Sequence, residues 1–209
     1  MRVWGLLFVV LLACTSVPGS GPAPASLRER LATETHLFVA ASDSAGAITA
    51  RRKTDTGWND QRVALALDSG ELVASAARDG NLMLSMFELG FRPVTIPASV
   101  LGHEAELTNL HVRLVAPTAA TAIWSGDDRA SATATLDLQL SWWLGVDGVG
   151  LPLGMPRLPP VALTLTLSDD GSGAAAELGV TAAGALWSWA QLVELSDFGL
   201  SLVARTPER

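Results

Sequence analysis

Several residue types are scarce or missing, and each shortage removes a class of structure or function. The 209 residues include no tyrosine, one lysine (Lys53) and one cysteine (Cys14). A single cysteine excludes a disulfide within the chain, so the apolar core must hold the fold together. Basic residues are also few, with 14 Lys and Arg against 21 Asp and Glu. This acidic balance argues against nucleic acid as a partner, because nucleic-acid-binding domains carry basic patches.

Catalytic signatures are missing as well. The chain has no G-x-S-x-G, H-E-x-x-H, P-loop or dinucleotide fingerprint. Its three histidines are His36, His103 and His111. On one straight strand His103 and His111 would lie about 26 Å apart, too far to share a metal ion. We therefore expect no catalytic residue, no metal site and no cofactor. A solvated strand end is the preferred interpretation of His103, and a metal or acid–base role beside Glu104 and Glu106 is the alternative.

Two short polar runs have an ordinary and a functional interpretation. Asp169–Gly173 offers oxygen ligands but lacks the spaced acidic positions and the distal Glu of a calcium loop, which favours a hairpin turn. Arg51–Lys53 is the only basic run, and we interpret it as a solvated strand end, with contact to lipid headgroups as the alternative.

The first fourteen residues are the most informative part of the sequence. Arg2 is followed by ten uncharged residues, Val3 to Leu12. A membrane-spanning helix needs about 20 apolar residues, so this run is too short. A basic start, a short apolar region and small residues after it are typical of a secretory signal.

The run ends in Leu11-Leu12-Ala13-Cys14, which resembles the lipobox of bacterial lipoprotein precursors. This resemblance implies that a diacylglyceryl group is attached to Cys14 and that the signal is cut between Ala13 and Cys14. Two or three acyl chains would anchor the protein, since one chain binds a bilayer only marginally. Thr15 is not the aspartate that commonly retains such proteins in the inner membrane, so the outer membrane is favoured. The alternative is an ordinary signal peptide with an incidental cysteine.

These features divide the chain into three parts. We expect a lipoprotein signal peptide at 1–13, a lipidated cysteine with a Pro/Gly-rich tether at 14–25, and a single β-rich domain at 26–209. Removal of the signal takes away one basic residue and leaves a net charge of −8. Such a domain gains little attraction to anionic lipid, so the acyl group would supply the membrane attachment.

Most of the domain shows the two-residue period of β-strands. The pattern appears, for example, in Val63–Leu67 and Leu110–Leu114, and Asp79-Gly80 between apolar runs is typical of a hairpin. The strands follow one another at hairpin spacing rather than alternating with helices. The sequence therefore predicts a mainly β fold: a single antiparallel curved sheet, sandwich or partly closed barrel with one or two short helices.

Three segments carry more specific expectations. Ala130 to Trp142 alternates without a break over thirteen residues, which predicts a curved or bulged strand with Val161–Ser168 as its hairpin partner. Its apolar side chains grow from Ala to Leu to Trp, as if the space beneath widens. Ser26 and Glu29 match a capping box that would begin a helix running to about Thr33. A second short helix is predicted over Leu186–Leu195.

The candidate binding feature is the Gly/Pro-rich connection Gly145–Pro160. Uninterrupted loops of this length are uncommon and often functional, and this one carries many apolar side chains that must pack on something. It is interpreted as a plug for one end of the sheet, or else as a gate over an apolar cavity or a contact for a partner. Trp142 and Trp143 precede it and would point to opposite faces. The candidate loop or patch comprises Trp142, Trp143, Leu151, Leu153, Met155 and Leu158.

Three functions remain open at this point. The first is a non-catalytic, membrane-anchored module that binds a lipid or another apolar ligand within a curved sheet. The second is an accessory or structural lipoprotein with a solid core that acts through a protein partner in the envelope. The third, which the missing motifs disfavour, is an envelope hydrolase whose site would be assembled from distant strands.

The lipobox resemblance generates a direct test at Cys14. Cys14→Ser removes the only thiol, so radiolabelled fatty acid supplied to the cells should no longer be incorporated into the protein. Ser16→Ala, two residues away, should be labelled as strongly as the natural chain. Label on the Cys14→Ser protein would contradict the lipobox interpretation.

Overall fold

The fold is described by a computed structural model that covers residues 25–102, 104–146, 149–154, 156–169, 171–189 and 193–207. In this part of the chain, fourteen strands form one sheet, accompanied by two short α-helices and a 3₁₀ turn. The mainly antiparallel β fold predicted from the sequence is confirmed. The helical elements are α1 (Leu27–Arg30), η1 (Ala41–Asp43) and α2 (Ala98–Leu101). The strands are β1 (Thr35–Val39), β2 (Ala45–Thr54), β3 (Gly57–Leu65), β4 (Leu67–Ala76), β5 (Leu82–Phe91), β6 (Val94–Ile96), β7 (Ala105–Leu114), β8 (Thr118–Trp124), β9 (Arg129–Leu136), β10 (Leu138–Val146), β11 (Val149–Pro152), β12 (Val161–Asp169), β13 (Ala174–Trp189) and β14 (Val193–Arg205).

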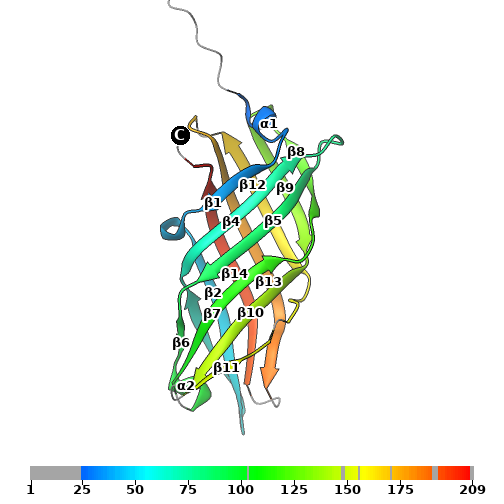
Figure 1. Cartoon of the computed structure of the whole chain (residues 1–209). Coiled ribbons are helices and arrows are strands. Elements are labelled where there is room, and N and C mark those ends of the chain that lie inside the picture. The colour runs from blue at the N-terminus through cyan, green and yellow to red at the C-terminus, as the bar shows by residue number, and fades with distance from the viewer. Residues whose placement is uncertain are drawn as a thin grey trace, which may run out of the picture.

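One half of the sheet closes into an eight-stranded barrel. Its strands follow the order β1-β4-β5-β8-β9-β12-β13-β14, and β14 pairs back onto β1. The ring is completed where Leu82–Leu84 of β5 pair with Thr118–Ala120 of β8. We call this half the helix end, because α1 lies there in Figure 1.

The other half opens into two facing sheets. Beyond the ring, β5 pairs with β7, which also pairs with β6 and β10, and β10 pairs with β11. On the opposite side β14 pairs with β2, and β2 with β3. The β2–β3 and β10–β11 hairpins project away from α1 (Figure 1), and we call this half the hairpin end.

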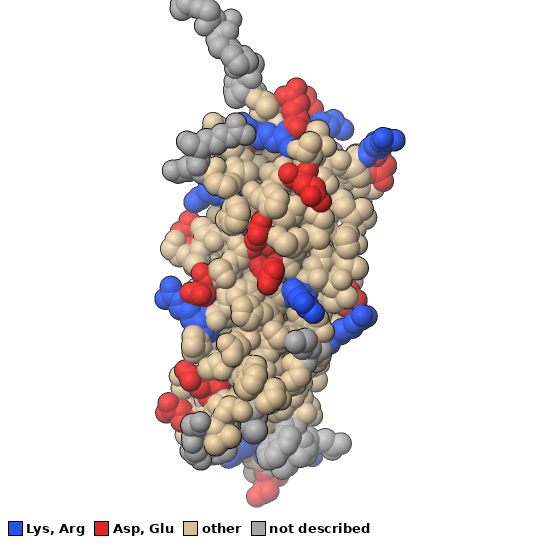
Figure 2. Space-filling view, in the orientation of Figure 1, with Lys and Arg blue, Asp and Glu red and all other residues tan. Residues whose placement is uncertain are grey.

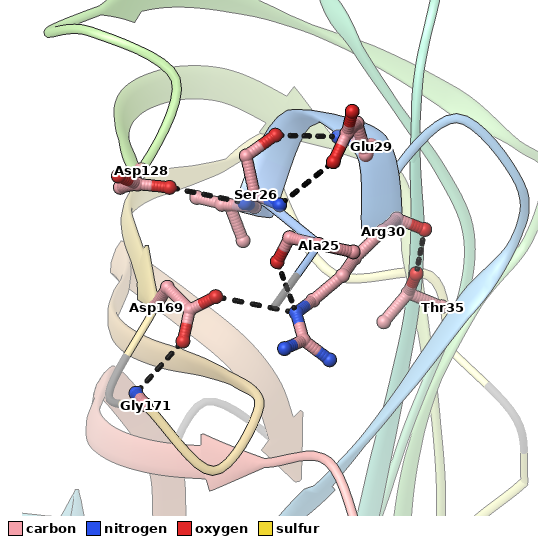
Figure 3. A network of polar contacts seen from close by, with 9 residues as sticks. Ala25, Ser26, Glu29, Arg30, Thr35, Asp128, Asp169 and Gly171 are labelled. Carbon is pink, nitrogen blue, oxygen red and sulfur yellow. Dashed lines mark hydrogen bonds and ion pairs between the residues drawn. The ribbon is translucent and has the colours of Figure 1, made fainter. Parts of the chain in front are cut away.

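Helix α1 covers the barrel at the helix end. Ser26 and Glu29 form the predicted capping box, with the Glu29 amide donating to Ser26 Oγ and the Ser26 amide donating to the Glu29 carboxylate. Arg30 Nε donates to Asp169 Oδ2 at 3.2 Å, which ties the helix to the end of β12 (Figure 3). Leu27 and Leu31 have no exposed surface and belong to the main core. The helix therefore closes the barrel with two leucine side chains.

The buried side chains grow in size from the helix end to the hairpin end, and the structure gives a physical reason for this gradient. At the helix end the strands present alanines, which leave room for Leu27 and Leu31. Larger strand residues fill the interior toward the hairpin end, where α2 adds the buried Val100. The buried alanines of the helix end are Ala74, Ala120, Ala130, Ala132, Ala174, Ala176 and Ala204.

Two expectations need correction. The chain does not run as one strand from Ala130 to Trp142, because it is interrupted at Asp137 and divides into β9 in the barrel and β10 in the sheet below. The expected pairing is right for β9, which pairs with β12 from Leu136–Val161 to Arg129–Ser168, but the pair is not a hairpin because β10 and β11 lie between the two strands. The helix predicted over Leu186–Leu195 is wrong: 186–189 end β13 and 193–195 begin β14, because pairing between these strands outweighs the local helical pattern.

Among the described residues, neither helix has the length and apolar character needed to cross a membrane.

The plugging role of α1 predicts a large loss of stability for Leu27→Ala. Removing a fully buried leucine side chain leaves a cavity and costs about 2–5 kcal/mol. Ile123→Ala is the control, because Ile123 is 75% exposed on the outer face and its truncation should cost less than about 1 kcal/mol. Urea denaturation measures both values, and equal losses would contradict the packing described here.

Candidate functional site

The Gly/Pro-rich connection continues the sheet. Its first part forms β11, which pairs with the end of β10. Farther on, the Leu140 amide donates to Pro156 O at 3.0 Å and the Leu158 amide donates to Leu138 O at 2.8 Å, so this segment runs along the beginning of β10. Leu158 is 6% exposed and lies in the core, and Leu153 packs against it. The described part of the connection therefore covers the edge of β10, as a plug would.

Trp142 and Trp143 point to opposite faces, as the alternation predicts. Trp142 is 1% exposed, whereas Trp143 is 43% exposed. The rings of Trp142 and Trp187 meet edge to face, with centroids 6.2 Å apart and planes at 83°. Since Trp142 belongs to β10 and Trp187 to β13, this contact joins the two facing sheets inside the hairpin end.

The indole N–H of Trp142 has no hydrogen-bond partner. It is the single such buried side-chain group in the described part of the chain. An unpaired buried donor costs roughly 1–3 kcal/mol, and buried tryptophan usually finds a partner for its N–H. This donor is thus available to an acceptor that enters the hairpin end.

The outer face of the β10–β11 hairpin is apolar and exposed. Trp143 lies opposite Pro152, and a Cβ on Gly150 would lie 3.4 Å from the Trp143 ring, so the ring rests over that glycine. Pro152 and Gly150 are exposed on the same face. Val149 is 61% exposed but lies on the opposite face of the hairpin, because faces alternate along β11. We call Trp143, Gly150 and Pro152 the Trp143 patch. Leu151 lies in β11 but its side chain is outside the described part, as are Met155, His103 and Cys14.

The remaining sequence candidates are held in local contacts. Asp169 accepts from the Gly171 amide at 2.7 Å and from Arg30, so it caps a turn and anchors α1. Arg51 pairs with Glu194 and lies over the Trp58 ring at 5.1 Å. The pKa of Arg51 is raised by the hydrogen bond to Glu194. Within the described residues, no group of three or more His, Cys, Asp or Glu is placed to hold a metal ion.

One polar cluster was missed by the sequence analysis. Ser196 is fully buried, and its hydroxyl contacts Asp197 Oδ2 at 3.1 Å, while Asp197 Oδ1 accepts from the Gly184 amide at 3.1 Å. Asp197 has φ +51° and Gly184 has φ +87°. Both lie where the β13–β14 register shifts, so the cluster fixes a paired bulge. A signal for this bulge was present in the sequence, because Ser196-Asp197 and Ala183-Gly184 interrupt two otherwise strand-like segments.

Comparisons with known proteins do not assign this site. No protein-family model, curated protein or solved structure matches the chain.

The bulge makes stability depend on the charge of Asp197. The pKa of Asp197 is lowered by the Gly184 amide, the Ser196 hydroxyl and Arg51. Asp197→Asn keeps a residue that tolerates positive φ but loses the charge, which should lower the free energy of unfolding by up to about 1 kcal/mol at pH 7. Because the pKa of Asp197 is lower in the folded protein than its ordinary value of 3.8, its charge stabilises the fold at pH values above 3.8. The difference in free energy of unfolding between the natural chain and Asp197→Asn should therefore shrink as the pH falls through the lowered pKa.

Urea denaturation between pH 7 and pH 3 measures this difference. Asp55→Asn is the control, because Asp55 is exposed in the β2–β3 turn and makes no hydrogen bond in the described residues. A difference between natural chain and Asp197→Asn that stays constant down to pH 3 would show that the charge of Asp197 does not hold the bulge.

Proposed function

We propose that the protein is a lipid-anchored lipoprotein of the bacterial envelope that acts without catalysis, by presenting its β domain to a protein partner. The observation that carries this proposal is the packed interior of the domain combined with an exposed apolar patch at the hairpin end. The proposal takes the outer membrane as the favoured location and Cys14 as the anchor.

The packed interior favours action through the surface. Along the segment from Ala130 to Trp142, the inward-facing side chains are 0–4% exposed, except for Ala134, which is partly buried and packs against the core. A side chain that lined a water-sized cavity would have accessible surface. The described interior beneath this segment is thus filled by protein side chains, which supports a solid core over an internal ligand site.

The positions of the two ends favour the hairpin end as the contact surface. The described chain begins beside α1, so an anchor at Cys14 would attach the domain through its helix end (Figure 1). The Trp143 patch then points away from the membrane, where a partner in the envelope can reach it. Charged side chains of both signs are spread over much of the face in Figure 2, so this face carries no surface of a single charge sign.

The partner would bring an apolar surface to Trp143. Exposed tryptophans contribute strongly to interfaces, because a large ring is buried at a small entropic cost. Here the ring is already supported by Gly150 and Pro152. The partner is therefore expected to cover Trp143 and the exposed Pro152 together.

A photo-crosslinking amino acid at position 143 tests this proposal in membranes of the native cell. We expect a discrete crosslinked protein from position 143 and none from position 123, since Ile123 is also exposed but lies on β8 at the helix end. Pro152→Asp should weaken the crosslink from position 143, because Pro152 is exposed directly opposite Trp143. Equal crosslinking from both positions would contradict a partner surface at the hairpin end.

The alternative is an apolar ligand, and one observation favours it: the unpaired indole N–H of Trp142. A lipid ester carbonyl at the hairpin end would satisfy that donor. Mass spectrometry of an organic extract of the purified protein distinguishes the two functions in the same preparation. A stoichiometric lipid that disappears in Trp142→Phe would replace the partner proposal, whereas absence of lipid together with the crosslink supports it.

A further inference from the structure

A shallow hollow lies on the outer face at the centre of the sheet, away from the Trp143 patch, and its largely apolar lining carries a few polar groups. Its volume is about 250 Å³, and it spans the neighbouring strands β1, β4, β5 and β7. These strands come from three separate parts of the chain, because β4 and β5 form one hairpin. The side chains that line it are Phe38, Ser69, Glu71, Glu88 and His111.

The floor of the hollow exists because residue 90 is glycine. Gly90 of β5 lies in register between Ser69 of β4 and His111 of β7. A Cβ at this position would come within 2.8 Å of Ser69 Oγ and 3.4 Å of His111 Cε1. The hydroxyl and the imidazole therefore lean over the glycine, and any side chain there would occupy the hollow. No hydrogen bond joins Ser69 to His111 among the described residues, so the pair lacks the contact of an activated nucleophile.

Two carboxylates face each other across the hollow. Glu71 of β4 is directly opposite Glu88 of β5, an arrangement that destabilises an antiparallel pair. Glu71 is in contact with His36, with 2.5 Å between Oε1 and Nδ1. Glu88 has Arg113 opposite it on β7, but Arg113 donates to Gln139 at 2.6 and 3.0 Å instead.

The Glu88 carboxylate is thus left without an ion pair or hydrogen bond in the part of the chain that the structure describes. A basic neighbour stands in the next strand and does not neutralise it. Between two facing carboxylates, an added positive charge would remove the repulsion and gain charge-assisted hydrogen bonds.

The aromatic ring of Phe38 also lines the hollow. Phe38 of β1 lies opposite Glu71 and is 46% exposed. Cations are attracted to the face of an aromatic ring, and an alkyl chain attached to the cation would pack against the same ring. A primary ammonium carries three N–H donors, which match the acceptors on Glu71, Glu88 and Ser69.

We propose that this hollow binds a primary alkylammonium group. The group is supplied either by a free diamine or by a lysine side chain of a peptide, since both present the same chemistry. The ammonium group contacts the carboxylates of Glu88 and Glu71, and the alkyl chain packs along the Phe38 ring. Because Gly90 has no side chain, the floor of the hollow is free to accept the group. The proposal does not depend on the partner at the Trp143 patch.

The test is a titration of the full lipidated chain in non-ionic detergent with 1,5-diaminopentane, and separately with the tripeptide Gly-Lys-Gly. Isothermal calorimetry at about 0.15 M salt measures the dissociation constant while surface attraction is screened. We expect saturable binding of at least one probe. Binding of the diamine alone identifies a free amine as the source, and binding of the tripeptide identifies a protein side chain.

Two variants locate the binding. Glu88→Gln should raise the dissociation constant roughly tenfold, because a charge-assisted hydrogen bond is lost. Gly90→Ala should weaken binding at least as much by filling the floor, and the Ser69 hydroxyl can rotate aside so that the fold is kept. Glu177→Gln is the matched control: Glu177 is an exposed glutamate on the outer face of β13.

Three results would overturn the proposal. The first is no saturable binding of either probe by the natural chain. The second is an equal effect of Glu88→Gln and Glu177→Gln, which would show general attraction to an acidic protein. The third is unchanged binding in both Glu88→Gln and Gly90→Ala. Circular dichroism of each variant verifies that the β fold is retained.

Discussion

Strands β5 and β14 each change partners partway along their length, and the rest of the structure depends on these two changes. At the helix end they bond to β8 and β1 and close a barrel; toward the hairpin end they bond to β7 and β2, and the barrel opens. Buried backbone groups need partners along the whole strand, so each new strand must begin where the previous one ends. The bulge held by Asp197 shifts the register of β14 against both β13 and β2, which allows one strand to serve two curvatures.

The two halves solve the packing problem differently. At the helix end, small residues on the strands leave space that Leu27 and Leu31 of α1 fill. At the hairpin end α2 buries Val100, and the edge-to-face pair of Trp142 and Trp187 spans the gap between the sheets. The first solution satisfies its polar groups through the capping box and Arg30. The second leaves the Trp142 N–H without a hydrogen-bond partner, so the described interior of the hairpin end contains a buried donor that is not satisfied.

Much of the fold was accessible from the sequence, and the errors have physical causes. The two-residue period, the Asp79-Gly80 hairpin and the capping box are local signals, and each is confirmed. The helix predicted over Leu186–Leu195 is wrong because cross-strand pairing decides such a segment. Unbroken alternation from Ala130 to Trp142 did not reveal the interruption at Asp137, since both strands keep the same period on either side of it. Alternation also placed Trp142 and Trp143 on opposite faces, but it carried no information on the hollow around Gly90.

The sequence by itself determined which side of each strand is apolar, where the hairpin turns lie and how α1 begins, because those properties depend on residues a few positions apart. It also carries the lipobox-like segment, which is read as a linear motif. Only the tertiary structure decided that β9 and β10 belong to different halves of the sheet, that α1 closes the barrel, and that Phe38, Glu71, Glu88 and His111 meet across four strands. Strand order depends on which distant surfaces bury the most apolar area together, and no local pattern encodes that choice.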